Sequence, residues 1–276
     1  MNARFQIRIQ RYGWDKACEH YETGWKNSLA PAQEKLLALC DVQTGERVLD
    51  LACGTGLVTV PLADAVGPAG QVVATDLSDR MVEHTRRLCQ ARALDQVMTM
   101  RADAEHLSEF EEGSFDLVTC ALGLMYCPDP GAALREAFRV LKPGGRAVFA
   151  VWGTRKNCGW AEIFPIVDAR VHSSVCPMFF HLGTSDILAA EMKRAGFQTI
   201  ETHRLSCDLP YPDAKTAIDA AFIGGPVALA YSRFDEATRN EIRREYLNSI
   251  SDYQQGSGFK IPGEFVVNYG AKPTRA

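Results

Sequence analysis

The sequence has no excess of positive charge. Its 276 residues carry 30 Lys and Arg against 34 Asp and Glu, which gives a formal net charge of −4. Tight binding to a phosphate backbone needs a basic surface that releases counterions, and this composition does not supply one. We therefore expect no nucleic-acid partner.

Long apolar runs and paired-cysteine motifs are also missing. No stretch of about 18 apolar residues occurs, and residues 1–11 lack the apolar segment of a signal peptide. The nine cysteines form no Cys-x-x-Cys pair, which is typical of a protein from a reducing cytosol. These absences predict a cytoplasmic protein with no membrane partner. Aromatic patches leave a homo-oligomer open, and no pattern fixes its symmetry.

The short motifs of several enzyme classes do not occur either. The chain has no Gly-x-Ser-x-Gly elbow and no His-Glu-x-x-His pair. These absences disfavour a hydrolase or a metallopeptidase, and no metal site is predicted.

What the sequence does contain, from about residue 31 to residue 152, is an alternation of strand-length apolar runs with helical stretches. This rhythm predicts parallel strands joined by helical crossovers. The first helix is expected to begin at Pro31, because proline is favoured at a helix start. The predicted strands are 47–52, 70–76, 97–101, 115–121 and 146–152, and the helices that follow the first are 57–66, 79–92 and 130–141.

The pattern loosens after Trp152. A helix capped by Thr184 or Ser185 is expected to end at Gly196, and two strands are expected at 199–209 and 259–269. The stretch between these strands is helical by pattern and predicts a cap. We expect one domain over residues 1–276, with a core at about 31–155 and 184–276 and cap elements at about 1–30, 156–183 and 213–254.

The most informative segment is 48–56, a buried strand that ends in small residues and leads into a helix. Small residues let a ligand approach the backbone closely. A nicotinamide-binding turn would need a third glycine, but the residue three positions after Gly56 is Thr59. Asp76 stands twenty residues after Gly56 at the end of the second predicted strand, where a carboxylate can accept from both hydroxyls of a ribose. A third acid, Asp103, closes the third strand.

Five segments together resemble the class I S-adenosylmethionine-dependent methyltransferases, in particular the small-molecule branch that includes ubiquinone- and menaquinone-type enzymes. The segments are 50–56, 74–81, 102–105, 115–121 and 141–146, and they occur in the family's order. The resemblance implies an α/β, doubly wound, Rossmann-like sheet of seven mostly parallel strands. Its last strand, 259–269, would be antiparallel to 199–209. The implied cofactor is S-adenosylmethionine, with S-adenosylhomocysteine as its product.

The resemblance also assigns the cofactor-binding residues near the first two strands. The backbone at Ala52, Gly54 and Gly56 would flank the methionine part, although the family more often has glycine at position 52. Asp76 would bind the ribose. Asp50 has two interpretations that stay open: it meets the cofactor's ammonium group, or it only caps the turn through its side chain.

The remaining assignments by resemblance come from other parts of the chain. Leu77 and Met81 would enclose the adenine, and Asp103 and Ala104 would contact its amino edge. The main chain around Cys120 would meet the amino-acid end of the cofactor. From an aromatic N-terminal stretch, Tyr21 would reach the cofactor, whereas its spacing alone indicates an amphipathic helix.

The implied function is methyl transfer to a small acceptor, apolar or aromatic. Such a displacement needs no nucleophilic side chain, because positioning and exclusion of water supply much of the catalysis. His181, in an aromatic segment, is a weak candidate for a base, with His172 as another; the simpler interpretation is an apolar lid. Alternatives are an RNA or protein methyltransferase, a nicotinamide-dependent dehydrogenase, and a non-catalytic module that binds S-adenosylmethionine.

Overall fold

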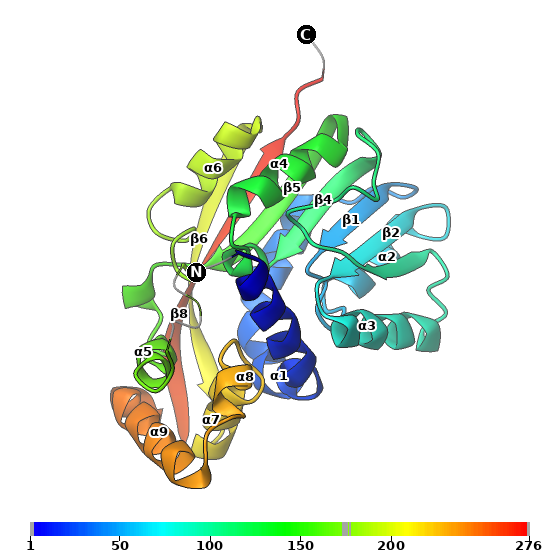
Figure 1. Cartoon of the computed structure of the whole chain (residues 1–276). Helices are drawn as coiled ribbons and strands as arrows, with labels where there is room; N and C mark the ends of the chain where they lie inside the picture. The colour runs from blue at the N-terminus through cyan, green and yellow to red at the C-terminus, as the bar shows by residue number, and fades with distance from the viewer. Residues whose placement is uncertain (1–2, 173–175, 177, 275–276) are drawn as a thin grey trace.

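The computed structural model describes residues 3–172, 176 and 178–274 (Figure 1). Its first half alternates helices and strands in this order: α1 Ala3–Cys40, β1 Arg47–Leu51, α2 Thr59–Val66, β2 Gln71–Asp76, α3 Asp79–Ala91, β3 Val97–Arg101, β4 Phe115–Ala121, the short 3-10 helix η1 Leu124–Tyr126, α4 Pro130–Val140 and β5 Leu141–Trp152. The second half contains η2 Arg155–Asn157, α5 Ile163–Asp168, α6 Ile187–Ala195, β6 Gln198–Tyr211, α7 Ala214–Phe222, α8 Ala228–Tyr231, α9 Glu236–Ser249, η3 Ser251–Tyr253, β7 Gln254–Gln255 and β8 Gly258–Ala271.

The strands form one sheet in the order β3-β2-β1-β4-β5-β8-β6. β1 to β5 pair in parallel, and β8 is antiparallel to both β5 and β6. The predicted doubly wound sheet with an antiparallel last strand is therefore confirmed. The two-residue β7 pairs with β8 and lies outside the seven-strand path.

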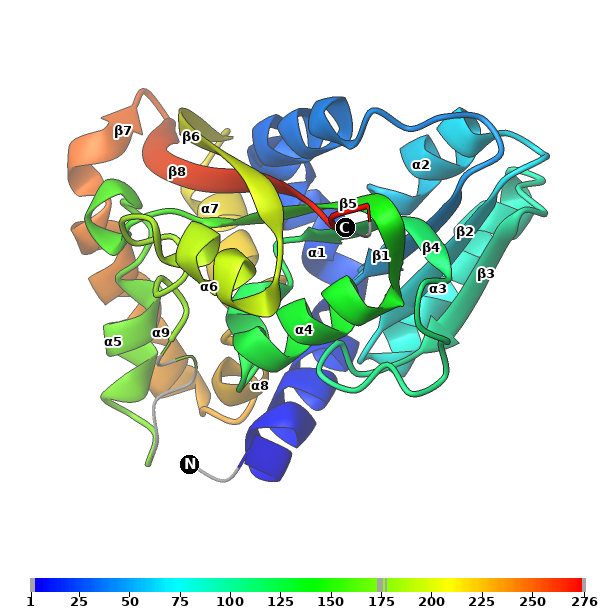
Figure 2. The ribbon, with the colours of Figure 1, turned by 90° about the horizontal axis from the view of Figure 1, so that it is seen from above.

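Helices cover both faces of the sheet (Figure 2). On one face, Leu36 of α1 and Leu62 of α2 pack in a cluster with Val72 of β2. On the other face, Leu134 of α4 and Met192 of α6 belong to the larger core. Because β1 to β5 are parallel, their carboxyl ends lie together at one edge of the sheet, which is where open α/β sheets bind ligands.

The prediction that the first helix begins at Pro31 is wrong. α1 runs without interruption through Pro31, from Ala3 to Cys40. A proline inside a helix removes one hydrogen bond and costs about 3 kcal/mol. Trp25 and Leu29 before the proline and Ala32 and Leu36 after it are all buried, so packing on both sides offsets this cost.

The predicted cap of α6 is also wrong. The residue that precedes the helix is Asp186, and its side chain makes no capping bond. Thr184 instead donates from its hydroxyl to the carbonyl of Phe180, at 2.8 Å. The predicted end is confirmed, because Gly196 adopts the left-handed conformation, with φ 110°.

The stretch between β6 and β8 is helical, as predicted. Figure 1 shows α7, α8 and α9 gathered with α5 at the lower end of the long strands β6 and β8, beside α1. α1 contacts α7 closely: a Cβ on Gly24 would lie 2.8 Å from Cα of Ala220. In the described part of the chain, no helix combines the length and apolarity that crossing a membrane requires.

The close approach of α1 to α7 predicts different effects for two glycines of the same helix. Gly24→Ala should lower the free energy of unfolding by about 1–3 kcal/mol, because α7 must move away. Gly13→Ala is the matched control, since its new Cβ would meet only Leu229 at an ordinary 3.8 Å. The control should raise stability by up to about 1 kcal/mol through helix propensity. Urea unfolding measures both, and equal stabilisation by the two variants would contradict the tight contact.

Candidate functional site

The turn after β1 is built from residues with positive φ. Ala52, Gly54 and Gly56 have φ of 53°, 56° and 91°. Cys53 N–H donates to the carbonyl of Thr75 at 2.9 Å, which joins this turn to β2. A left-handed alanine costs roughly 1–2 kcal/mol, and such strain is concentrated at functional sites. Ala52 thus takes the backbone conformation that glycine would adopt there.

Asp76 connects this turn to the start of α3. Its carboxylate accepts from Gly54 N–H at 3.0 Å and from Ser78 N–H at 2.8 Å, one bond to each oxygen. Asp76 is 9% exposed. Burial raises the pKa of its carboxyl to about 6, although the two hydrogen bonds act in the opposite direction and lower it. A carboxylate oxygen can accept more than one hydrogen bond, so both oxygens retain capacity toward a ligand.

A cavity of about 1020 Å³, counted with its open mouth, lies above these strand ends. Its floor includes Ala52, Gly54 and Asp76, and Leu122 after β4, which also has a positive φ of 63°. Its lining takes in residues from the ends of β1, β2 and β4 and from α1, and few of them are charged, as is usual for a small-molecule site.

Helix α1 forms the roof of the cavity. Residues of a single helical stripe line it: Ile7, Gln10, Trp14, Tyr21, Trp25 and Leu29. Polar contacts hold this half of α1 against α3, since Ser78 Oγ donates to Asp15 at 2.6 Å and Arg80 donates to Glu19 at 3.0 Å. The roof therefore depends on both apolar and polar contacts with the body of the fold.

Negative charge is confined to one side of the cavity. Among the described residues, the charged side chains that line it are Asp76, which ends β2, and Asp103 and Glu105, which follow β3. Glu105 accepts from Asp129 N–H at 2.8 Å, and burial raises its pKa. The side that bears the acids thus suits a ligand rich in hydroxyl and amino groups.

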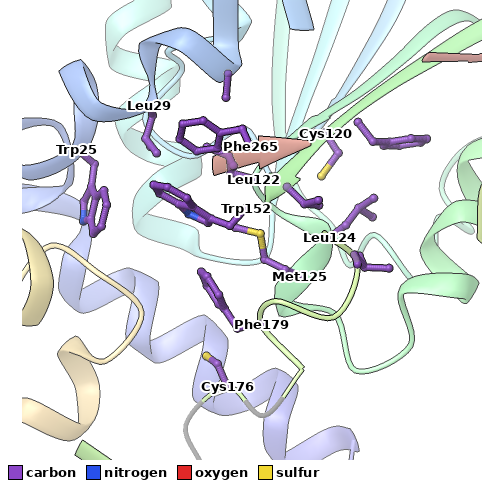
Figure 3. Close-up of a cluster of buried hydrophobic side chains, with 14 of the residues drawn as sticks. Trp25, Leu29, Cys120, Leu122, Leu124, Met125, Trp152, Cys176, Phe179 and Phe265 are labelled. Carbon is purple, nitrogen blue, oxygen red and sulfur yellow. The ribbon is translucent and has the colours of Figure 1, made fainter. Parts of the chain in front are cut away.

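The opposite side is aromatic. Trp25, Trp152 and Trp160 lie edge to face with ring centroids 4.7–5.9 Å apart. Figure 3 shows Trp25 and Trp152 in one apolar cluster with Met125 and Phe179. Edge-to-face rings are the favoured geometry of aromatic pairs, and they leave an apolar wall.

Most residues assigned from the sequence line this cavity. Near the ends of β1 and β2 and the start of α3, they are Ala52, Gly54, Asp76, Leu77 and Met81. Tyr21, Asp103 and Ala104 also line it.

Three assigned residues lie outside the cavity lining. Gly56 faces α3, where an added Cβ would meet the Thr85 side chain at 3.2 Å. Cys120 is buried, with its sulfur 2.8 Å from where a Cβ of Gly123 would be. The neighbouring residues 121–123, at and after the end of β4, do line the cavity. The assignment of the main chain around Cys120 therefore stays a prediction.

Asp50 is the third residue outside the lining. Its carboxylate accepts from the hydroxyls of Thr59 at 2.6 Å and Thr119 at 3.0 Å. The side chain is 1% exposed, and burial raises its pKa to about 6. Asp50 thus joins β1 to β4 and to the first turn of α2, and this geometry favours its structural interpretation.

The choice of His181 as a base is not supported by its position. His181 is exposed and does not line the cavity, and His172 is exposed as well. Phe179 and Leu182 are buried on either side of His181, so the turn directs the histidine toward solvent.

Sequence reasoning did not assign the aromatic wall. Trp14 and Trp25 were visible in the aromatic stretch near the N-terminus, and the helical spacing of 14, 21 and 25 was a usable signal. Tyr126 ends η1, and Trp152 is the last residue of β5; neither was assigned to the site.

Comparison with known proteins gives a family model for part of the chain. Residues 48–145 match a methyltransferase domain model. Demethylmenaquinone methyltransferase of Lactococcus lactis is 45% identical over 105 residues, which are 38% of this chain and 41% of the relative. The enzyme of the same name from Bacillus cytotoxicus is 36% identical over 132 residues, 48% of this chain and 55% of the relative. The chain thus spans about half the length of the curated relatives it matches.

Solved structures share the fold. A putative methyltransferase from Bacillus halodurans is similar at a TM-score of 0.63 and 21% identity, covering 88% of this chain and 100% of that chain. Phosphoethanolamine N-methyltransferase 2 of Haemonchus contortus, in complex with phosphomonomethylethanolamine and S-adenosylhomocysteine, has a TM-score of 0.60 and 18% identity. That match covers 99% of this chain and 61% of the other.

The buried Asp50 carboxyl predicts a stability that depends on pH. The pKa of Asp50 is about 6 in the folded chain and near 4 in the unfolded chain, so the folded chain holds this proton more tightly. The contribution of Asp50 to the free energy of unfolding is therefore complete below pH 4 and is lost as the pH rises through 6. Asp50→Asn should therefore be more stable than the wild type at pH 8, on the order of 1–3 kcal/mol. The hydroxyls of Thr59 and Thr119 can rotate, so that one of them accepts from the N–H of the new asparagine side chain. Urea unfolding should show this advantage growing by roughly 1 kcal/mol between pH 5 and 8. A constant difference would contradict the raised pKa.

Proposed function

We propose that the chain is, through residues 48–145, a class I S-adenosylmethionine-dependent methyltransferase and that it transfers a methyl group from this cofactor to a small apolar or aromatic acceptor. The observation that carries the proposal is the Asp76 carboxylate, which is buried, held by Gly54 and Ser78, and open to the cavity. This arrangement is well suited to accept from the two hydroxyls of a ribose.

The residues around Asp76 fit the rest of the cofactor. We assign Leu77 and Met81 to the adenine faces and Asp103 with Ala104 to its edge, because all four line the cavity near the ends of β2 and β3. At Gly54, whose Cβ would be 4.0 Å from the Tyr21 ring, the turn leaves room for the methionine part.

Bound S-adenosylmethionine supplies a methyl group already activated by the positive sulfonium. The chain's own contribution is to hold the two reactants in line and to exclude water under the roof of α1. No histidine, lysine or arginine of the described residues lines the cavity, so we assign no general base.

The acceptor side of the proposal rests on the aromatic wall. Trp25, Trp152 and Trp160 carry no charge, which suits a small uncharged and preferably aromatic molecule. The relatives named for demethylmenaquinone suggest a quinone-type ring as one candidate. The formal net charge of −4 disfavours RNA as the acceptor.

The architecture and the cysteines support two more proposals. The cavity takes its lining from residues as far apart as Ile7 and Pro226, so we propose that residues 1–276 act as one domain. All nine cysteines are free, which supports a cytoplasmic location.

Asp76→Ala should abolish most of the cofactor affinity. Loss of the hydrogen bonds from a charged group to the ribose is expected to cost about 2–4 kcal/mol of binding free energy. Calorimetry with S-adenosylmethionine and S-adenosylhomocysteine measures this loss. Asp64→Ala, an exposed acid on α2, is the matched control and should bind like the wild type. Equal affinities for all three proteins would remove Asp76 from the site.

Cofactor affinity should also depend on pH through Asp76. Its pKa is about 6 in the unliganded chain, and hydrogen bonding to the ribose favours the ionised form. Affinity should therefore fall as pH drops through 6, approaching tenfold per pH unit. Calorimetry between pH 5 and 8 follows this dependence. An affinity that stays constant over this range would show that Asp76 does not titrate on binding.

A further inference from the structure

The hydroxyl of Tyr126 makes no hydrogen bond in the described part of the chain, although Tyr126 lines the cavity. The residue ends η1, directly after β4, and its N–H donates to the carbonyl of Gly123 at 3.0 Å. The backbone is thus fixed, and no other described side chain takes up the hydroxyl. Tyrosine hydroxyls usually donate to a hydrogen-bond partner once they are buried.

Two aromatic contacts fix the ring of Tyr126. Trp14 of α1 lies 5.0 Å away at an interplanar angle of 79°, and Phe179 lies 5.4 Å away at 70°. These neighbours come from the roof and from the segment after α5. The ring is therefore held from two sides, and the position of its hydroxyl is set before a ligand arrives.

Aromatic contacts connect Tyr126 to the methionine end of the proposed cofactor site. Its neighbour Trp14 also contacts Tyr21, with ring centroids 5.8 Å apart. Tyr21 in turn lies over Gly54, at 4.0 Å from where a Cβ would be. Tyr126 and Gly54 line the same cavity, so an acceptor bound at Tyr126 shares that cavity with the proposed cofactor.

The chemistry of the hydroxyl is that of a neutral donor. Burial raises the pKa of Tyr126 well above its usual value of 10, so the group keeps its proton at neutral pH. Among the indole N–H groups of the wall, that of Trp25 already donates to the carbonyl of Ala220 at 3.0 Å, and that of Trp160 is buried and not accessible to solvent.

We propose that the Tyr126 hydroxyl donates a hydrogen bond to a carbonyl or phenol oxygen of an uncharged aromatic acceptor. The aromatic wall binds the ring of this acceptor, and Tyr126 orients it by its oxygen. Tyr126 is in this sense a specificity-determining residue, and the assignment rests on the function proposed above.

A pair of matched probes tests the hydrogen bond. 1-Tetralone carries one carbonyl oxygen, and tetralin is the corresponding hydrocarbon; neither reacts with thiols. Tyr126→Phe keeps the ring and removes the hydroxyl. Calorimetry on protein saturated with S-adenosylhomocysteine should show the affinity for 1-tetralone falling about tenfold in the variant, the scale of one lost hydrogen bond. The affinity for tetralin should stay within about twofold, because its binding depends on apolar contact alone.

Tyr231→Phe is the control variant, because the Tyr231 hydroxyl already accepts from Arg243 at 2.8 Å and does not line the cavity. It should bind both probes like the wild type. Equal changes for the two probes in Tyr126→Phe, or wild-type protein that binds no 1-tetralone, would overturn the inference. Binding of S-adenosylhomocysteine is measured first, and the probes are also titrated without it. A chain that does not bind this product refutes the proposed function, whereas one that binds it without discriminating the probes refutes only the role of Tyr126.

Discussion

The pair of hydrogen bonds that Asp76 accepts holds the floor of the cavity together. One comes from the turn after β1 and the other from the residue that caps α3, so a single carboxylate sets the spacing of two strand ends. The backbone donors are rigid, and the acid is buried at their meeting point. The cofactor site proposed above depends on these two hydrogen bonds of Asp76, because they fix the turn after β1 relative to the start of α3.

Two buried carboxylates of similar pKa therefore have different roles in this fold. Asp50 is 1% exposed and is bound by two threonine hydroxyls that belong to the surrounding elements. Asp76 is bound by two backbone N–H groups and still lines the cavity. Burial is the main cause that raises the pKa of both, so a shifted pKa does not by itself identify a binding residue. What separates them is whether an oxygen faces open space.

Much of the fold and of the cavity floor was readable from the sequence, because both depend on local patterns. Strands with crossover helices follow from alternating apolar runs, and Asp76 follows from its distance to the glycine turn. The start of α1 and the cap of α6 were wrong because tertiary packing overrode a local preference. His181 could be named only as a weak candidate beside the simpler apolar lid, since the side on which a turn residue faces depends on buried neighbours. The aromatic wall joins residues as distant as Trp14, Tyr126 and Trp152, and no local pattern places them together.

The lining of the cavity divides along the chain in a way that bears on how such proteins diversify. The floor lies within residues 48–145, the segment that matches the family model, whereas the roof comes from α1 and much of the aromatic wall from residues beyond 145. Both donors to Asp76, Gly54 and Ser78, also lie in that segment, so substitutions of the lining residues of α1 and of the wall beyond 145 do not remove them. A lineage built on this plan is free to exchange one acceptor for another while it inherits its methyl donor unchanged.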